Sequence, residues 1–465
     1  MRGLRPYRPA GKGLDITWAR LYLAVYHDRG AFMRERVLIR DLKNHIGEDV
    51  TIGGWVHSIR KQGKIVFVLI RDRTGVAQVT CKPEVIREGD LRNESVLYTT
   101  GTVLEDERAD GGVELMLKSE QVLSIPKKRL PILVNEKADY QKLELETMLN
   151  HRVLSLRNPK RNLIFRLQAD IIDTFRTYLR SEGFTEVTTP KIIATGTEGG
   201  TQLFTVDYFD RLSYLAQSPQ FYKQMLVGAG YERVFEIGHV YRAEIHNTSR
   251  HLNEYVSLDY EMGFIENEHD VMDVEERFII SLFERLNKDH PATLEIFGQR
   301  LPVPKKIPRI PIREACSILQ NVYGKKQKGY DLDPEGEKLI CEWAKKNYDT
   351  ELLFLIEYPL SKRPVYTMPL DHDPTFTCSF DLLFRGLEIT TGGQRIHDYE
   401  MLVDAFESRG LLSSDFDYYI DTFAYGMPPH GGLAIGLERI TQQILGLLNV
   451  REASIFPRDR GRIVP

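Results

Sequence analysis

Segment 240–255 places cationic and acidic side chains where they could hold an anionic ligand. Arg242 and Glu244 stand two residues apart, and Arg250 and His251 follow in a polar stretch. Residues two apart on a β-strand point to the same face, so the spacing predicts a strand with Arg242 and Glu244 side by side, then a loop. Taken alone, the segment is equally explained as a solvated sheet face and its turn.

A second segment of this kind lies near the C-terminus. A glycine-dense turn at 426–432 runs into Gly436-Leu437-Glu438-Arg439, a pattern typical of a strand that leads into a helix. Glycine lets the backbone approach a ligand closely, and a fixed guanidinium suits a phosphate or an adenine face. Taken alone, a glycine cap and a surface arginine would explain the same residues.

The elements that position these residues belong to an ordinary globular chain. It has 465 residues, of which 42% are hydrophobic and 28% charged, so we expect two or three domains rather than a disordered or coiled-coil protein. The net charge of −4 gives no whole-chain sign of nucleic-acid binding, so any such function must be local. The four cysteines are widely spaced and no apolar run reaches the roughly 20 residues of a membrane span. We therefore expect a cytoplasmic protein without a membrane segment.

The residue pattern changes twice in the first third of the chain. Residues 1–33 carry six basic and two acidic side chains, a net of +4 that leaves −8 for the rest, and we expect a poorly ordered extension there. Five β-rich runs between 34 and 124 predict a small closed barrel of the OB type. A basic cluster between two prolines marks a hinge within the linker that we place at 125–150.

Residues 151–465 are expected to form the second domain. Apolar residues recur at helical spacing over 163–179, and a β-branched run that ends at Pro190 follows. Further strand-like runs alternate irregularly with helices, and they lie at 233–241, 353–358 and 387–391. This pattern favours an α+β fold, an antiparallel sheet flanked by helices, with an intervening region at about 265–375 whose role the sequence leaves open.

Three segments together resemble the three ordered motifs of class II aminoacyl-tRNA synthetases. They are the helix and strand that end at Pro190, the segment with Arg242 and Glu244, and the unit that ends at Arg439. The resemblance covers residues 35–465, and the barrel is similar to that of the subgroup serving aspartate, asparagine and lysine. In this family the first motif builds the dimer interface, so the resemblance implies a homodimer that uses an apolar face of the helix and strand before Pro190.

The resemblance implies ATP as a substrate and Mg²⁺ as its companion ion. Arg242 would contact the α-phosphate, and Arg439 would lie near adenine and the γ-phosphate; these two are the expected catalytic residues. Glu388 and Thr391 match the family's pair of metal ligands, with Thr391 where serine is commoner. The expected ATP-binding set is Arg242, Glu244, Arg250, His251, Tyr255, Glu388, Gly436 and Arg439.

The amino-acid substrate follows from segment 217–223, which resembles the pocket of aspartyl-tRNA synthetases of archaeal type. Asparagine enzymes generally have glycine at the position of Pro219 and lack the lysine. Lys223 and Arg395 would bind the side-chain carboxylate of L-aspartate, because both groups are donors only and suit an acid better than an amide. The expected aspartate-binding set is Glu198, Ser218, Gln220, Lys223, Asp259, Thr391, Arg395 and His430.

The barrel supplies the expected contact with the tRNA anticodon. Between residues 58 and 73, five cations surround Phe67, which offers charge for phosphates and a ring for a base. The resemblance points to stacking on Phe67, with Gln78 and Glu114 next to the base edges. The alternative is core packing for Phe67 and a solvated face for the cations. The expected anticodon set is His57, Arg60, Phe67, Gln78 and Glu114.

His57 bears on how many tRNAs are served. The aspartate and asparagine anticodons differ at one base, and enzymes of this type that reject tRNA(Asn) usually have tryptophan where this chain has His57. The resemblance therefore favours a non-discriminating enzyme that charges tRNA(Asp) and tRNA(Asn), the latter for a separate amidotransferase. A second marker of such enzymes, a proline in the later barrel loop, is not evident near 108–110.

Three other functions stay open at this point. An asparaginyl-tRNA synthetase is disfavoured by Pro219 and Lys223. A synthetase-like enzyme that activates aspartate without using tRNA would usually lack the barrel. A regulator without enzymatic activity would be expected to lose Arg242, Glu388 or Arg439, and the sequence keeps all three.

Overall fold

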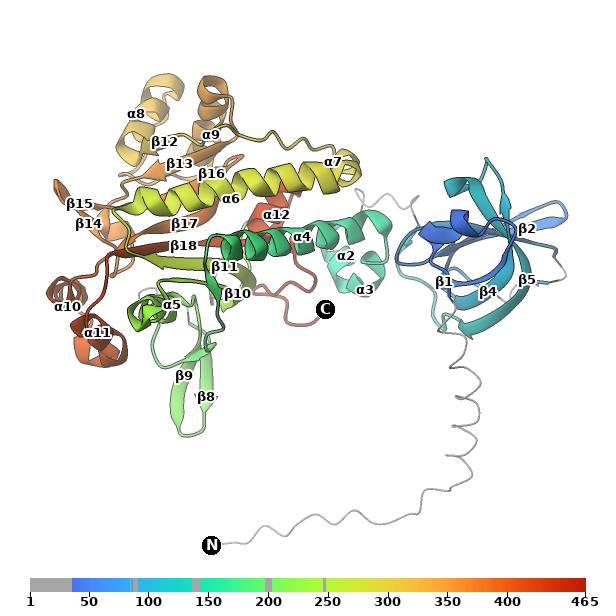
Figure 1. Ribbon diagram of the computed structural model, residues 1–465, viewed down its shortest axis with the longest axis horizontal. Helices are drawn as coiled ribbons and strands as arrows, with labels where there is room; N and C mark the ends of the chain where they lie inside the picture. The colour runs from blue at the N-terminus through green and yellow to red at the C-terminus, as the bar shows by residue number, and fades with distance from the viewer. Residues whose placement is uncertain (1–35, 84, 87–90, 136–142, 197–202, 246–247) are drawn as a thin grey trace, which may run out of the picture. The chain divides into compact units, whose positions relative to one another are not determined.

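A computed structural model describes residues 36–83, 85–86, 91–135, 143–196, 203–245 and 248–465 (Figure 1). The chain divides into two compact units, Met1–Tyr140 and Gln141–Pro465. The extension expected at residues 1–33 lies outside the described residues.

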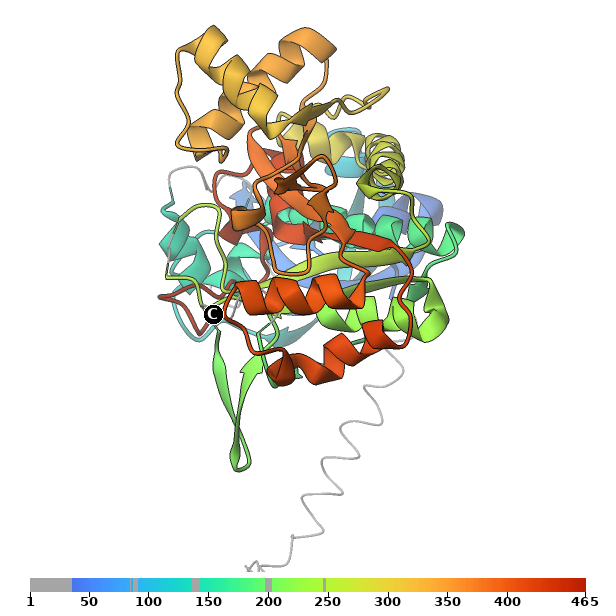
Figure 2. The ribbon, with the colours of Figure 1, turned by 90° about the vertical axis from the view of Figure 1, so that its left-hand side faces the viewer.

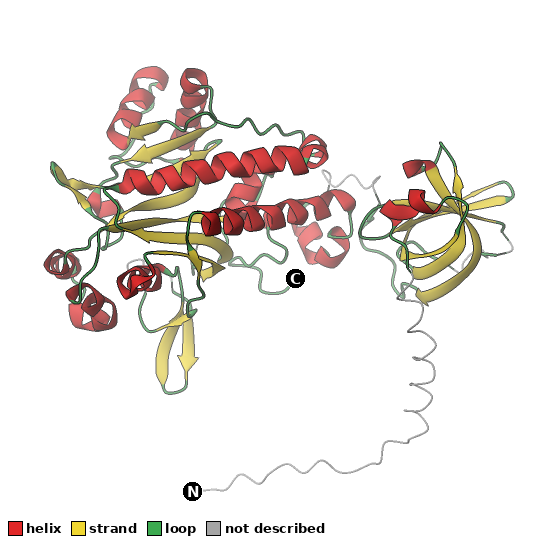
Figure 3. Cartoon of the chain, viewed as in Figure 1, coloured by secondary structure: helices red, strands yellow, loops and turns green. Residues whose placement is uncertain are grey.

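The first unit is a closed five-stranded barrel, as the sequence predicts (Figures 1 and 3). A 3-10 helix, η1 (Ile39–His45), packs against it. In β2, Val66, Val68 and Ile70 point into the core, and the alternation leaves Phe67 on the outer face. The strands pair in the order β1-β2-β3-β5-β4, and they are β1 (Asp49–Gln62), β2 (Ile65–Arg71), β3 (Val76–Cys81), β4 (Val96–Glu105) and β5 (Val113–Ser124).

The second unit is built on an eight-stranded, mainly antiparallel sheet, which confirms the predicted α+β class. Two edge pairs, β12 with β13 and β10 with β6, are parallel. In sheet order the strands are β12 (Arg309–Pro311), β13 (Leu352–Ile356), β16 (Ser379–Phe384), β17 (Leu387–Arg395), β18 (His430–Gly436), β11 (Glu254–Gly263), β10 (Arg233–Tyr241) and β6 (Thr185–Glu186).

Three helices cover one face of this sheet: α4 (Pro159–Ser181), α6 (Glu268–Asp289) and α12 (Leu437–Leu445). Figure 1 shows α4 and α6 side by side across the strands. Leu258, Tyr260 and Met262 of β11 point into this apolar layer, so the residues between them point to the opposite face. The helices therefore leave the polar side chains of β11 on the face that carries the candidate site.

Smaller elements surround the other face. Helices α8 (Ile312–Tyr323) and α9 (Pro334–Tyr348) pack on β12 and β13, while α5 (Gln220–Leu226), α10 (Tyr399–Ser408) and α11 (Asp417–Ala424) form a separate cluster (Figure 2). The other α-helices and strands of the described residues are α2 (Leu145–Asn150), α3 (Arg152–Ser155), α7 (Pro291–Ile296), β7 (Ile192–Ile193), β8 (Thr205–Tyr208), β9 (Arg211–Leu215), β14 (Pro369–Leu370) and β15 (Asp373–Thr377).

The predicted strand through Arg242 and Glu244 is wrong in detail, because β10 ends at Tyr241. The side chain of Asn253 donates to the carbonyl oxygens of Arg242 and Glu244, at 2.7 and 3.1 Å. One backbone bond, from Arg242 N to the carbonyl oxygen of Asn253 at 2.9 Å, continues past the end of β10, and the side-chain bonds of Asn253 hold the segment beyond it. Both side chains nevertheless face one cavity, described below.

The segment before Pro190 also differs from its prediction. Helix α4 starts at Pro159 behind the cap residue Asn158, but the strand after it, β6, has only two residues. Downstream, Thr189 bonds to the buried side-chain carboxylate of Glu236 on β10 instead of to the backbone of that strand. The apolar stripe of α4 is buried in the core of this unit, so it is not the free dimerisation face that the sequence suggested.

Helix α2 occupies part of the segment that the sequence assigned to the linker. Within the residues that the structure describes, no helix combines the length and the apolar character that crossing a membrane requires.

A buried carboxyl group lies between α6 and the sheet. Thr390 of β17 donates its hydroxyl to Glu275 Oε1 at 2.6 Å, and Glu275 has no exposed surface. Burial raises the pKa of Glu275 from 4.5 to about 8. The folded protein therefore holds Glu275 as a neutral acid at neutral pH.

Stability should consequently depend on pH through Glu275. Between pH 4.5 and 8 the unfolded chain ionises this group while the folded chain keeps it protonated, so stability falls as the pH rises. Glu275→Gln cannot ionise, so the variant does not show this loss. The stability of the variant relative to the natural chain should therefore rise by up to about 4 kcal/mol from pH 5 to pH 8. Urea midpoints at both pH values measure the change, with the exposed Glu284→Gln on the same helix as control. A stability difference that does not change with pH would contradict the assignment.

Candidate functional site

Two cavities meet on the sheet face that the helix layer leaves uncovered. Cavity A has a volume of about 260 Å³ and cavity B about 400 Å³. Arg242, Thr391 and Ala434 line both of them. A ligand that extends through the junction would therefore pass directly over Arg242.

A row of paired residues crosses the sheet under this junction. The register pairs Asp259 of β11 with Ala434 of β18, Ala434 with Thr391 of β17, and Thr391 with Asp381 of β16. Paired residues share a face, so the row brings polar groups from distant parts of the chain to one surface.

Every residue that the sequence assigned to ATP lines cavity A. Arg439 Nη1 is 3.1 Å from Glu388 Oε1, and Arg439 Nε donates to the carbonyl oxygen of Arg250 at 3.4 Å. The Arg242 guanidinium lies 6.0 Å from the ring centre of Tyr255. The other members are Glu244, whose Oε2 is 3.7 Å from His251 Nε2, and Gly436.

A β-bulge brings Glu388 and Thr391 into the same cavity. Residues three apart on a regular strand point to opposite faces. In β17, Glu388 pairs with Leu383 and Thr390 with the adjacent Leu382, so Ile389 is an extra residue that resets the alternation. Both side chains consequently line cavity A.

Glu388 and Thr391 also fit a small divalent cation. Their oxygens, Glu388 Oε1 and Thr391 Oγ1, lie 3.3 Å apart. A carboxylate and a hydroxyl are hard ligands of the kind Mg²⁺ prefers, with phosphate oxygens and water completing its shell. In the described part of the chain, no group of three His, Cys, Asp or Glu side chains offers another metal site.

Cavity B contains most of the residues assigned to the amino acid. Ser218, Gln220, Asp259, Thr391 and Arg395 line it. Lys223 and His430 do not, and both lie buried behind its wall. Glu198 lies outside the described residues.

Lys223 is held by acidic and carbonyl groups. Its Nζ lies 3.1 Å from Asp259 Oδ1 and 3.3 Å from Glu261 Oε2, and it donates to the carbonyl oxygen of Leu433 at 2.9 Å. Arg395 also pairs with Glu261, because Arg395 Nε lies 3.0 Å from Glu261 Oε1. Lys223 therefore acts from behind Asp259, whereas Arg395 reaches the cavity itself.

Glu261 is the residue that sequence reasoning missed. Burial alone would raise its pKa, but the charges of Arg395 and Lys223 hold the pKa below the usual value. Gly432 makes room for the carboxylate, since a Cβ there would lie 2.2 Å from Glu261 Oε2. The available signal was its position two residues after Asp259, because two acids at this spacing share a face if the segment is a strand.

His430 is part of this wall in its neutral form. Burial lowers its pKa to about 4. Its Nδ1 lies 2.9 Å from the carbonyl oxygen of Pro428, which can only accept, so Nδ1 carries the hydrogen. Nε2 then accepts from the amide of Gln224 at 2.8 Å, another residue that the sequence did not single out.

The outer face of the barrel gathers four of the five anticodon candidates. Two neighbouring rows run across β1, β2, β3 and β5. The first is Ser58, Leu69, Gln78 and Glu114, and the second is Arg60, Phe67, Thr80 and Met116. Gln78 Nε2 donates to Glu114 Oε2 at 3.0 Å, so these two side chains are already oriented beside the Phe67 ring.

His57 is not on this face. It lies at a bulge in β1 and is 6% exposed, with Nδ1 2.9 Å from Arg71 Nη1. Arg71 in turn pairs with buried Glu94 at 2.9 Å. The bulge turns His57 inward beside Val56, so the position of His57 at an anticodon-contacting surface, which the resemblance implied, is wrong.

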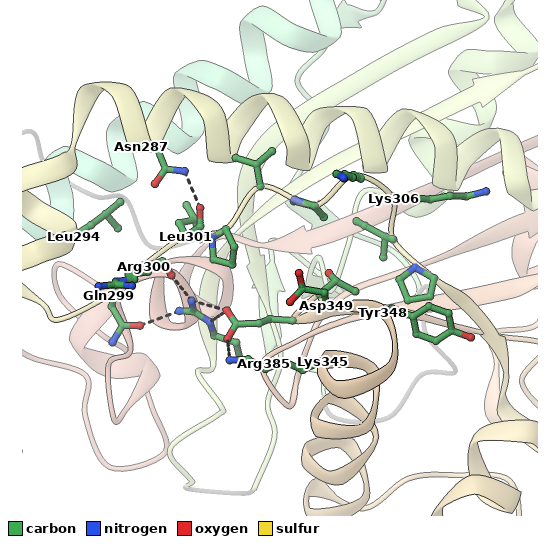
Figure 4. Close-up of a pocket in the computed structure, with 18 of the residues that line it drawn as sticks. Asn287, Leu294, Gln299, Arg300, Leu301, Lys306, Lys345, Tyr348, Asp349 and Arg385 are labelled. Atoms are coloured by element: carbon green, nitrogen blue, oxygen red, sulfur yellow. Dashed lines mark hydrogen bonds and ion pairs between the residues drawn. The ribbon is translucent and has the colours of Figure 1, made fainter.

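A larger cavity, of about 1790 Å³, contains none of the predicted site residues (Figure 4). Among the residues that line it, Arg385 donates to the side-chain oxygens of Glu351 and Gln299. Asn287 of α6 donates to the carbonyl oxygen of Leu301. Size alone therefore does not locate the chemistry.

Cavity A, with its arginines, tyrosine and hard oxygens, suits a polyanion that carries an aromatic base, and cavity B suits a small acid.

Residues 144–460 match the family described as class II tRNA synthetases (D, K and N), and residues 50–123 match the OB-fold nucleic acid binding domain. The chain belongs to the class II tRNA synthetases. It is an aminoacyl-tRNA ligase, and ATP is its substrate.

Relatives of this synthetase span nearly its full length. The aspartate–tRNA(Asp/Asn) ligase of Aeropyrum pernix is 47% identical, over 92% of this chain and 98% of that protein. The aspartate–tRNA(Asp) ligase of Pyrococcus abyssi is 42% identical, over 90% of this chain and 97% of that protein. The asparaginyl-tRNA synthetase of Pyrococcus horikoshii, solved with asparaginyl-adenylate, superposes with a TM-score of 0.87 at 30% identity, over 93% and 100% of the two chains.

Glu261 should be essential to the stability of the synthetase. Glu261→Gln removes the charge that both Arg395 and Lys223 face, and an uncompensated buried charge costs about 3 kcal/mol or more. The urea midpoint should fall accordingly, while the exposed Glu266→Gln should leave it unchanged. Equal midpoints for Glu261→Gln and the natural chain would show that the ion pairs of Glu261 with Arg395 and Lys223 do not stabilise the fold.

Proposed function

We propose that this synthetase activates L-aspartate with ATP and transfers the aspartyl group to the 3′ end of tRNA(Asp) and of tRNA(Asn). The observation that carries the substrate assignment is the buried group formed by Lys223, Arg395 and Glu261 at cavity B, directly next to cavity A. Two of the three relatives named above are aspartate–tRNA ligases, which supports the same amino acid.

Activation requires alignment and charge neutralisation rather than a general base. The substrate α-carboxylate is already ionised near neutral pH and attacks the α-phosphate of ATP. Arg242 lines both cavities, so it is the side chain that can touch the α-phosphate while the acid lies in cavity B.

The other cavity A residues divide the rest of the nucleotide. Tyr255 offers its ring to adenine, Glu244 accepts from the base, and Arg439, Arg250 and His251 face the outer phosphates. Gly436 leaves the backbone open at the floor of this cavity. Glu388 and Thr391 would hold Mg²⁺, which supplies positive charge to the phosphates.

Cavity B selects an acid through its donors. Arg395 lines the cavity and its guanidinium can only donate, so a side-chain carboxylate is matched and an amide NH₂ is not. Asp259, on the same wall, faces the substrate ammonium, and Ser218 and Gln220 complete the contacts. Lys223 and His430 support this wall from behind, and Glu198 is assigned to the ammonium by the family resemblance alone.

The asparaginyl-tRNA synthetase remains the alternative, since one such enzyme superposes closely. Activation of asparagine in preference to aspartate would select it.

The barrel face with Phe67, Gln78, Glu114 and Arg60 is proposed as the anticodon surface. A half-exposed ring between polar side chains can stack a base while its neighbours contact the base edge. His57 lies beneath this surface, so it would influence base choice through Arg71 and Glu94 rather than by contact.

Two further assignments rest on the family alone, a homodimer and an amidotransferase that would consume Asp-tRNA(Asn). A third, the cytoplasmic location, rests on the four widely spaced cysteines. We also propose the domain order that the sequence suggested, in which the extension 1–33 precedes a barrel unit, a linker and a synthetase unit.

Arg242 gives the first test of this function. Arg242→Ala removes a charge-assisted contact worth about 1.5–3 kcal/mol, a factor of roughly ten to over a hundred in rate. Aspartate-dependent ATP–pyrophosphate exchange should fall by that factor, while the exposed Arg211→Ala should exchange normally. Exchange near the natural rate in Arg242→Ala would remove Arg242 from the mechanism.

Charging of the two tRNAs gives the second test. Purified tRNA(Asp) and tRNA(Asn) transcripts should both accept aspartate, with kcat/KM values within about tenfold, or 1.4 kcal/mol, of each other. Phe67→Ala should weaken both reactions while leaving pyrophosphate exchange intact, because the barrel takes no part in activation.

A gap of more than about a hundredfold, or 2.7 kcal/mol, between the two tRNAs would show a discriminating enzyme. Loss of pyrophosphate exchange in Phe67→Ala would show that the variant damages more than anticodon binding.

A further inference from the structure

Helix α9, in the intervening region whose role the sequence left open, reaches the loop that carries Arg250. Glu337, in the first turn of α9, forms an ion pair with the Arg250 guanidinium. The side chains are only 14% and 22% exposed. Glu337 lines neither cavity, whereas Arg250 lines cavity A.

The position of Glu337 is set by close packing of α9 on the sheet. Gly386, in the turn between β16 and β17, has φ +79°, and a Cβ there would lie 2.9 Å from the Cα of Lys338. The turn and the helix backbone are therefore in direct contact, one residue from Glu337. Asp333 caps the helix by accepting from Gly336 N at 2.7 Å.

Arg250 is thus held at two points. Its backbone carbonyl accepts from Arg439 Nε, and its guanidinium pairs with Glu337. Arg439 is in turn fixed by Glu388. The chain of contacts joins α9, the loop after β10 and the residues of cavity A.

We propose that Glu337 is a positioning residue that aims the Arg250 guanidinium at the phosphates of ATP in cavity A. The inference rests on the proposed function only in its assignment of cavity A to ATP. A long arginine side chain has many rotamers, and a buried carboxylate that selects one of them lowers the entropy cost of binding the nucleotide.

The environment of Glu337 agrees with a fixed role. Burial raises its pKa to about 7, although Arg250 acts in the opposite direction. Arg250 therefore favours the ionised form of a carboxyl group that burial alone would keep neutral.

Steady-state ATP–pyrophosphate exchange with the full chain tests the proposal. Glu337→Gln should raise KM for ATP about tenfold, the loss of one charge-assisted bond, while KM for aspartate and kcat stay within twofold. Arg250→Ala should raise KM for ATP at least as much. The double variant should be no worse than Arg250→Ala, because Glu337 acts only through Arg250.

Two matched variants complete the design. Glu342→Gln, an exposed acid on the same helix, should leave every constant unchanged. Glu337→Asp keeps the charge with a shorter reach and should fall between Glu337→Gln and the natural chain.

An unchanged KM for ATP in Glu337→Gln would overturn the proposal. So would factors that multiply in the double variant, or a rise in KM for aspartate as large as that for ATP, which would show a general structural role. Equilibrium dialysis with ATP alone separates this inference from the proposed function. Absence of aspartate-dependent exchange in the natural chain rejects the function, whereas an unchanged Kd for ATP in Glu337→Gln rejects the role of Glu337.

Discussion

The buried carboxylate of Glu261 is the constraint on which the site depends. It lies between Lys223 of α5 and Arg395 of β17, so it fixes a helix and a strand to β11 at the same point. Without Glu261 the buried charge of Arg395 would lose its ion pair, and Lys223 would keep, among the described residues, only Asp259 as an acidic partner. The glycine opposite, Gly432, is required by the same carboxylate. The Arg395 guanidinium is therefore fixed at cavity B before any ligand arrives, which is how a protein stabilises a bound acid without reorganising.

One face of the sheet packs against the apolar core, and the opposite face carries the candidate site. On β11, Leu258, Tyr260 and Met262 pack under the helix layer, and Asp259 and Glu261 between them build the site. Strand alternation makes this division possible within one segment of chain. Helices α8 and α9 cover only the edge of the functional face, which leaves cavities A and B open while Glu337 still reaches the loop with Arg250.

The barrel uses the same principle with a different purpose. Its core-facing residues are apolar, and its outer face presents Phe67 beside the bonded pair of Gln78 and Glu114. His57 departs from the alternation because a bulge turns it inward toward Arg71. A residue that distinguishes close tRNAs from this position would act on the shape of the barrel wall.

Much of this protein is determined by local sequence. The barrel, helix α4 and strand β10 follow from alternation and helical periodicity, because these patterns report which side chains face a core. The residues of cavity A were identified through the resemblance of their motifs to a family, because each segment taken alone is equally explained as a polar surface.

Only the tertiary structure decided the rest, and the physical reasons are specific. The bulge at Ile389 puts Glu388 and Thr391 on one side, and the bulge at His57 hides that ring; an extra residue in a ladder leaves no mark in composition. Lys223 and His430 were expected in the cavity but lie buried behind its wall. There they form hydrogen bonds with groups that are far away in the sequence. Such pairings depend on which strands become neighbours, a choice that the whole fold makes and no single segment contains.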